Sequence, residues 1–205
     1  MTNAPFDRST SGDALAVAAI LLGTPGDDEL EAVGDGDILR GYAGRDLLTS
    51  AFNATELYGD ADDDVLVTDV TVSGGEEGAA EVSALQDGGS GDDRLTVDAR
   101  ALARFGPAEI DLTLRGGLGD DVIQAFASIA SFTDAVIVGD IDGGQGDDTI
   151  GVQMEVEAET NAMPLRTRGG SGDDSISIEA WNTAAFFGGD VATWRRGRSA
   201  TQVTT

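Results

Sequence analysis

The sequence contains no cysteine, no histidine and no lysine, and only 4 of its 205 residues are proline. Without cysteine there is no disulfide framework and no thiolate chemistry. Without histidine there is no imidazole for a zinc site or for general-base catalysis. Aromatic residues make up only 5% of the chain. These absences exclude the most common catalytic and transition-metal centres.

Positive charge is also scarce. Twelve arginines face 38 acidic residues, which gives a formal net charge of −26. Binding to nucleic acid or to anionic lipid requires a basic face, so we expect neither partner. However, 40% of the residues are hydrophobic, so a core can form if the negative charge is neutralised. A hard cation such as calcium, which prefers oxygen ligands, is the natural counter-charge.

Long hydrophobic runs are missing. The longest, Ala14 to Leu22, is too short to span a bilayer, so we expect no membrane insertion. It also lacks the basic flank and the cleavage site of a secretory signal peptide. The sequence therefore predicts that residues 1–22 form an N-terminal cap, as a strand or a helix.

Glycine, in contrast, occurs 29 times and marks an internal repeat of nine residues. Looser copies begin at Gly23, Gly41 and Gly59, and close copies begin at Gly88, Gly116, Gly143 and Gly169. The sixth position is always aspartate: Asp28, Asp46, Asp64, Asp93, Asp121, Asp148 and Asp174. The eighth is always a large aliphatic: Leu30, Leu48, Leu66, Leu95, Ile123, Ile150 and Ile176. The close copies add glycines at the second and fourth positions: Gly89, Gly91, Gly117, Gly119, Gly144, Gly146, Gly170 and Gly172.

This pattern suits a metal-binding turn. Glycine permits positive φ, so the chain bends tightly with its carbonyl groups directed inward. These carbonyls and the sixth-position carboxylate are hard oxygen donors, and two stacked turns together supply the six to eight oxygens that calcium prefers. All the repeated glycines and aspartates named above are therefore candidate calcium ligands. The eighth-position aliphatic would point into the core, with its neighbours pointing outward.

The repeat resembles the RTX, or haemolysin-type, calcium-binding nonapeptide G-G-x-G-x-D-x-U-x, and the resemblance runs from Gly23 to Ser177. It implies an all-β fold, a parallel β-roll (a β-solenoid) that holds several calcium ions, about six, in its turns. It also implies export by type I secretion without a cleaved signal, and hence a location outside the cell or on its surface.

The spacing of the copies predicts how the coils stack. First-position glycines at 23, 41, 59, 88, 116, 143 and 169 give steps of 18, 18, 29, 28, 27 and 26 residues. We interpret every step as one coil, narrow over 23–67 and widened over 68–187. On the opposite edge, a degenerate copy at Ala32 to Arg40 keeps Asp37, whereas the window from Ser50 to Tyr58 has no aspartate. The sequence thus predicts a single column of calcium turns.

The widened coils contain alternating segments. From Ile150 to Ala158, and from Ile110 to Leu114, every second residue is apolar, which predicts strands with one wet face. We expect irregular tips between the strands at residues 73–80, 99–108, 127–133 and 159–164. The competing hypothesis is a chain of separate antiparallel hairpins, in which each motif is merely a turn.

The end of the chain is expected to close the roll. We predict a C-terminal cap or tail over 188–205, with aromatic side chains covering the open end and a basic tail after them. The residues concerned are Trp181, Phe186, Phe187, Trp194, Arg195, Arg196 and Arg198. On the strands, Leu47, Val65 and Val122 are expected to point outward, where either a neighbouring loop covers them or they form a contact stripe for a partner.

We do not expect an enzyme. Adjacent carboxylates such as Asp92 and Asp93 could form an acid–base pair, but seven copies of one active site argue against that role. An EF-hand is excluded because the glutamate at its twelfth position is missing. We expect a secreted module that folds on binding calcium and has a structural or binding role. The alternatives are a self-assembling cell-surface or matrix building block, and an enzyme whose catalytic part is not evident, which the 22 residues before the first motif disfavour.

Overall fold

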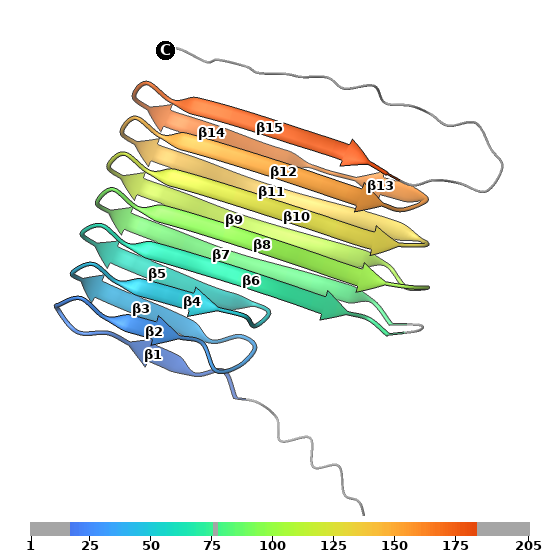
Figure 1. Ribbon diagram of the computed structural model, residues 1–205, viewed down its shortest axis with the longest axis horizontal. Coiled ribbons are helices and arrows are strands. Elements are labelled where there is room, and N and C mark those ends of the chain that lie inside the picture. The colour runs from blue at the N-terminus through green and yellow to red at the C-terminus, as the bar shows by residue number, and fades with distance from the viewer. Residues whose placement is uncertain (1–16, 76–77, 184–205) are drawn as a thin grey trace, which may run out of the picture.

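The computed structural model describes residues 17–75 and 78–183, and all regular secondary structure in these ranges is β-strand (Figure 1). The strands wind into a solenoid of two facing sheets. Their bounds are β1 Ile20–Leu22, β2 Glu29–Glu31, β3 Ile38–Ala43, β4 Leu47–Ser50, β5 Thr55–Ala61, β6 Val65–Ser73, β7 Ala80–Ser90, β8 Arg94–Ala103, β9 Ala108–Leu118, β10 Val122–Ser131, β11 Asp134–Gln145, β12 Thr149–Glu157, β13 Thr160–Ala162, β14 Leu165–Ser171 and β15 Ser175–Asn182.

Successive strands alternate between the two sheets. The eight-stranded sheet has the order β1-β3-β5-β7-β9-β11-β13, with β14 also paired to β11, and the seven-stranded sheet has the order β15-β12-β10-β8-β6-β4-β2. All strand pairs in the described residues are parallel. The predicted parallel β-solenoid is therefore confirmed. A chain of hairpins would have given antiparallel pairs.

The register of the seven-stranded sheet follows the repeat. Its eighth-position residues are direct partners from coil to coil, in the order Leu30, Leu48, Leu66, Leu95, Ile123, Ile150 and Ile176. The five inner side chains are at most 1% exposed, whereas those of Leu30 and Ile176, on the terminal strands, are only partly buried. Steps of 18 and of 26 to 29 residues are thus both single coils, as the spacing predicts.

The solenoid widens at the third coil. Strand length rises from 4 residues in β4 to 9 in β6 and 11 in β7. The strands also reach further than predicted, since β8 and β10 continue to Ala103 and Ser131 and β13 lies inside the expected tip at 159–164. Alanine is a weak strand former, which favours an irregular tip. The structure instead buries Ala99, Ala101 and Ala103 in alternation, and these small side chains fill the interior between the sheets.

The structure describes only small parts of the predicted caps. Strand β1 pairs with β3, so residues 20–22 belong to the first coil itself. Trp181 lies in β15 and is 36% exposed. The other predicted capping and tail residues, at 186, 187, 194–196 and 198, lie outside the described ranges. In the part of the chain that the structure describes, no helix has the length and apolar character needed to cross a membrane.

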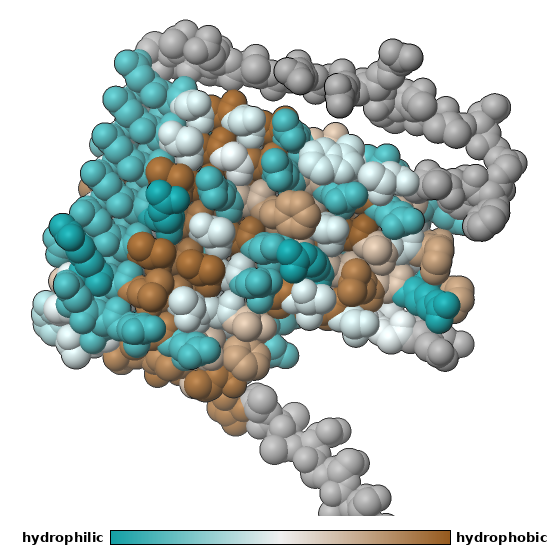
Figure 2. All heavy atoms as spheres, viewed as in Figure 1, coloured by the Kyte–Doolittle hydropathy of each residue, from teal (hydrophilic) through white to brown (hydrophobic). Residues whose placement is uncertain are grey.

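Charged side chains on the outer face of the eight-stranded sheet form a register-matched row. Arg40, Tyr58, Asp87, Arg115, Asp142 and Arg168 are successive partners. Ion pairs join Arg115 to Asp87 at 4.0 Å and Arg168 to Asp142 at 3.0 Å. The few arginines therefore offset acidic charge on the strands. Figure 2 shows that the turn edge, in contrast, is uniformly hydrophilic.

The three apolar residues that are expected to point outward lie on the seven-stranded sheet. Leu47 is the partner of Val65, and Val65 and Val122 both pair with Arg94, so the three apolar side chains lie close to the turn edge. All three are partly exposed. The structure therefore confirms their outward position, and their role stays a prediction.

Candidate metal centre

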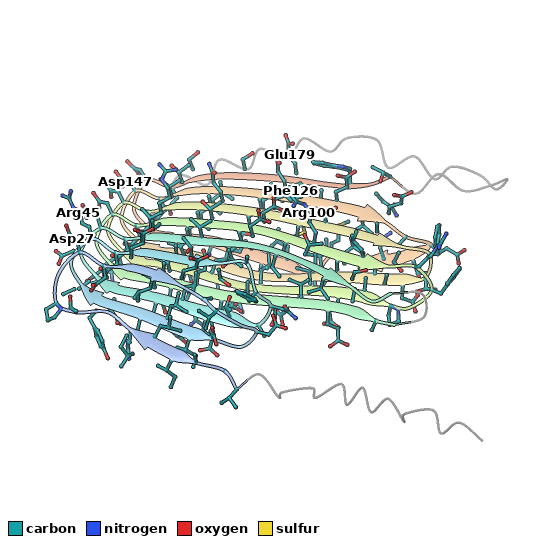
Figure 3. The ribbon with its side chains drawn as sticks, turned by 60° about the horizontal axis from the view of Figure 1, so that its bottom comes forward. Asp27, Arg45, Arg100, Phe126, Asp147 and Glu179 are labelled. Atoms are coloured by element: carbon teal, nitrogen blue, oxygen red, sulfur yellow. The ribbon has the colours of Figure 1, made fainter. Side chains whose placement is uncertain are left out.

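The seven Gly-Asp turns lie in one column, each leading from the eight-stranded sheet to the next strand of the seven-stranded sheet. Their fifth-position side chains point outward, as Asp27, Arg45 and Asp147 show in Figure 3. Their sixth-position aspartates point inward. Five of them are at most 2% exposed: Asp46 and Asp64 in the looser copies, and Asp93, Asp121 and Asp148 in the close copies. Adjacent aspartates thus have opposite environments.

The sixth-position carboxylates tie the turns together. Oδ1 of Asp121 accepts a hydrogen bond of 2.8 Å from the backbone N–H of Asp93 in the preceding turn, and Oδ1 of Asp148 accepts one of 2.9 Å from Asp121. The same bond recurs at every step from Asp28 to Asp174. Each sixth-position aspartate from Asp46 to Asp174 therefore links two coils through one of its oxygens.

The other carboxylate oxygen has no partner. Oδ2 of Asp46, Asp64, Asp93, Asp121 and Asp148 is buried and accepts no hydrogen bond. It faces the first-position glycine of its own turn and the first-position carbonyl of the next. A Cβ at Gly88, for example, would collide with Oδ2 of Asp93 and would lie 2.7 Å from the carbonyl oxygen of Gly116. Two oxygens from adjacent turns, the unpartnered Oδ2 and a glycine carbonyl, thus flank one point.

Burial of these carboxylates opposes their ionisation. Loss of solvent around the side chain, with the charges of neighbouring aspartates, raises the pKa of Asp93 to about 8 and that of Asp121 to about 7. The same causes raise the pKa of Asp64 and of Asp148 to about 6. Backbone hydrogen bonds lower these pKa values but do not outweigh burial. A column of buried anions therefore requires a counter-charge.

The donor set fits a hard cation. No three carboxylates in the described ranges converge as a metal-binding group, so most ligands must be main-chain carbonyls. Calcium accepts a mixed set of carbonyl and carboxylate oxygens at 2.3–2.6 Å in flexible geometry. Oδ2 of a sixth-position aspartate and the first-position carbonyl of the following turn would hold it, and the ion would supply the missing positive charge between coils.

The fifth-position aspartates form a second series of bonds that sequence reasoning missed. Oδ1 of Asp120 accepts a hydrogen bond of 2.8 Å from the N–H of Asp147 in the following turn, and Oδ1 of Asp92 accepts one of 2.9 Å from Asp120. This series runs in the opposite direction to the sixth-position one. The repeated Asp-Asp pair was the available signal. These hydrogen bonds show that the exposed fifth-position aspartates stabilise the stacking of the turns and do not contribute to the buried pairs of oxygens.

The predicted glycine ligands act partly through the absence of a side chain. Gly117 has φ of 121°, and a Cβ there would collide with the carbonyl of Gly89 in the preceding turn. In the looser copies, Tyr42 and Asp60 hold the second position at φ of 81° and 79°, and Asp62 holds the fourth at 74°. These residues keep the turn conformation at a cost in strain of order 1–3 kcal/mol each.

The carboxylates of Asp28 and Asp37 differ in their contacts from the five sixth-position aspartates with an unpartnered Oδ2. Both the N–H and the hydroxyl of Thr24 donate to Oδ2 of Asp28, so this oxygen is already satisfied. On the opposite edge, Asp37 accepts from the N–H groups of Ala19, Val33 and Gly34, and these bonds, that of Ala19 above all, lower its pKa. The five sixth-position aspartates with a buried, unpartnered Oδ2 lie in one column, whereas Oδ1 of Asp98, which is also buried and unpartnered, lies on β8 outside the turns.

A methyl group placed between the two oxygens tests this geometry. In Gly116→Ala the Cβ would collide with Oδ2 of Asp121 and meet the carbonyl of Gly143 at 2.5 Å. We expect at least about a tenfold loss of calcium affinity at this step, because a displaced ligand costs 1.4 kcal/mol or more. Gly151→Ala is the matched control, since nothing lies within 4 Å of its Cβ. Calorimetric titration of both variants decides, and equal affinities would contradict the site.

The fold and the turns together define a parallel β-solenoid with a column of stacked Gly-Asp turns. Residues 21–52 and 113–128 match the family model of the RTX calcium-binding nonapeptide repeat in four copies. The chain thus carries RTX repeats, and the resemblance seen in the sequence is confirmed. The copies beginning at Gly59, Gly88, Gly143 and Gly169 lie outside the matched ranges but keep the sixth-position aspartate and the eighth-position aliphatic residue. No curated protein and no solved structure matches the chain.

Proposed function

We propose that the chain is a calcium-dependent structural or binding module that folds when calcium enters the column of turns. The observation that carries this proposal is the set of five buried Oδ2 atoms without a hydrogen-bond donor. Each comes from a sixth-position aspartate, and each faces a carbonyl of the next turn, as Gly88 shows for Asp93. A bound cation relieves the repulsion along the column and joins adjacent coils at the same time.

Calcium suits this column better than magnesium. Magnesium requires near-ideal octahedral geometry at 2.0–2.1 Å and keeps several of its waters, whereas calcium accepts carbonyl-rich sets. We assign one ion to each step at which the aspartate Oδ2 is buried and unpartnered, which is five, and an optional sixth at Asp28, whose Oδ2 is held by Thr24. The proposed ligands are the sixth-position aspartates with the repeated glycines of the adjacent turns, in the narrow coils of residues 23–67 and the widened coils of 68–187.

The proposed place of action is outside the cell or at its surface. Calcium sites of extracellular modules have dissociation constants of 10⁻⁴–10⁻³ M, so they fill at millimolar calcium and stay empty at cytosolic levels. A chain that cannot neutralise its net charge of −26 in the cytosol would remain unfolded there. This property supports type I secretion as the route, and the repeated turns favour a structural role over catalysis.

Calorimetric titration with calcium and with magnesium tests the proposal. Several calcium ions should bind with dissociation constants of about 10⁻⁴ M, with a large heat from coupled folding. Magnesium at the same concentration should give little heat and little change in far-UV circular dichroism. Binding of both cations with equal affinity, or of calcium at fewer than two sites, would overturn it.

A further inference from the structure

The contacts between adjacent turns follow one repeating pattern, which the last inner step illustrates. The N–H of Asp148 donates to Oδ1 of Asp174 at 3.1 Å, and the N–H of Asp173 donates to Oδ1 of Asp147 at 2.8 Å. Two backbone bonds of 2.8 Å accompany them, from the N–H of Ser175 to the carbonyl of Asp148 and from the N–H of Gly146 to the carbonyl of Ser171. A turn is therefore held by donors and acceptors on both of its faces.

At each end of the column, the terminal turn has hydrogen-bond donors and acceptors that no neighbouring turn in the described ranges satisfies. The turn that ends at Asp174 has no following turn in the described ranges, so Oδ1 of Asp173 and the N–H groups of Asp174 and Gly172 lack the partners that inner turns have. The first turn has no preceding turn there, so Oδ1 of Asp28 and the N–H of Asp27 are the corresponding unused groups. Each free donor on one end matches a free acceptor on the other.

The first turn keeps this match only in part. Its third position is Pro25, and the inner pattern uses the carbonyl at that position, as Leu118 and Gln145 show by accepting from Gly91 and Gly119 at 2.7 Å. Proline lacks the N–H that parallel pairing of the third positions also uses, but it keeps its carbonyl. The N–H of Gly172 in one copy can therefore bond to Pro25 of the next.

The last turn is also half of a cation site. A Cβ at Gly169 would collide with Oδ2 of Asp174, as at the inner turns, but no first-position carbonyl of a following turn lies beside it. In the inner turns a glycine carbonyl of the next coil fills that place, as Gly41 does beside Gly23 and Asp28. The first-position carbonyl of another copy, that of Gly23, is the missing ligand.

We propose that a second copy of this chain stacks head to tail on the turn that ends at Asp174, with calcium held between that carboxylate and the carbonyl of Gly23 in the next copy. This inference rests on the proposed calcium binding and extends it to assembly. Asp173 and Asp174 on one end face Asp27 and Asp28 on the other, so the ends repel each other without a cation. A head-to-tail contact leaves a free end on each copy, so it continues into filaments.

Because the chain has no cysteine, single cysteines report the orientation directly. In the stacked arrangement the exposed side chains of Asp27 and Asp173 are neighbours, with Cα atoms about 5 Å apart, which a disulfide can span. Asp27→Cys and Asp173→Cys, mixed in millimolar calcium and oxidised, should give a disulfide-linked heterodimer. Each variant alone should give little disulfide-linked dimer, because every head-to-tail contact then contains only one cysteine. Homodimers of either variant as the main product, or no dimer from the mixture, would overturn the head-to-tail arrangement.

Sedimentation velocity of the full chain tests the role of the metal. In millimolar calcium the weight-average sedimentation coefficient should rise with protein concentration, and Asp174→Asn should weaken association about tenfold or more. Asp173→Asn is the matched control, because it removes the same charge next to the site but keeps an acceptor oxygen. A folded, calcium-bound chain that stays monomeric, as when terminal residues of the chain itself cover the ends, would reject assembly and leave the proposed calcium binding intact. Loss of calcium-induced folding would reject both.

Discussion

Chelation of calcium should remove most of the β-sheet signal of this protein, and addition of calcium should restore it. The expected effect is large because the stabilisation is repeated along the column. A site with a dissociation constant of about 10⁻⁴ M contributes about 1.4 kcal/mol at millimolar calcium. Five such sites, one for each unpartnered buried Oδ2, contribute about 7 kcal/mol, which is comparable to the whole stability of a typical domain.

The same geometry explains why the metal-free chain should not keep the fold. Five sixth-position carboxylates are buried in sequence along one edge, and burial raises their pKa, with values of about 6 to 8 at Asp64, Asp93, Asp121 and Asp148. At pH 8, ionisation of these groups in the folded state places like charges on adjacent coils. Without a cation the column therefore opposes the packing of the aliphatic core behind it.

Far-UV circular dichroism and thermal unfolding at pH 8, in chelator and in millimolar calcium, measure this effect. Magnesium at equal ionic strength controls for charge screening. An unfolding temperature that does not differ between chelator and calcium would show that the aliphatic core alone supports the fold, and that calcium is not the folding switch.

The stacking of the coils was predictable because the motif fixes both the turn and the register. A single eighth-position aliphatic per copy, placed two residues after the aspartate, is enough to align Leu95 with Ile123 and Ile150 although the coils between them differ in length. Insertions are accommodated at the far edge, where β6 and β7 lengthen together to 9 and 11 residues. The column of turns therefore stays straight while the solenoid widens.

The roles of individual oxygens were not predictable from sequence. The motif shows that an aspartate is always at position six, but only the structure separates Oδ1, which bonds to the preceding turn, from Oδ2, which has no partner. Asp28 has the same motif position as Asp121, yet the neighbouring Thr24 occupies its Oδ2. Such differences depend on contacts between residues of different coils or on side-chain rotamers, which a linear pattern does not encode.

The backbone conformation of the turns in the looser copies was also not predictable from their composition. Tyr42, Asp60 and Asp62 have the positive φ that glycine has in the close copies. A pattern search treats these copies as degenerate. The structure shows that neighbouring coils impose the turn conformation on them, since parallel pairing joins Tyr42 to Asp60 and Asp60 to Gly89 in register.

Asp121→Asn should change stability in opposite directions with and without calcium. Asparagine keeps an oxygen that can accept from the N–H of Asp93, so the bond between turns survives. It removes the buried charge whose pKa is raised to about 7, so the metal-free protein should become more stable. In millimolar calcium the variant lacks an anionic ligand, and we expect a loss of about 1.4 kcal/mol for each ion that Asp121 contacts. Chemical unfolding in millimolar calcium measures the loss, and the far-UV circular dichroism that remains in chelator measures the gain.

Asp120→Asn is the control that separates a ligand from a stacking residue. Its carboxylate is exposed and accepts from the N–H of Asp147 at 2.8 Å, a bond that asparagine also makes. Because solvent screens this charge, we expect changes within about 0.5 kcal/mol in both conditions. Equal effects of the two variants in calcium, or a loss of stability for Asp121→Asn in chelator as large as in calcium, would assign Asp121 to stacking alone and remove it from the metal site.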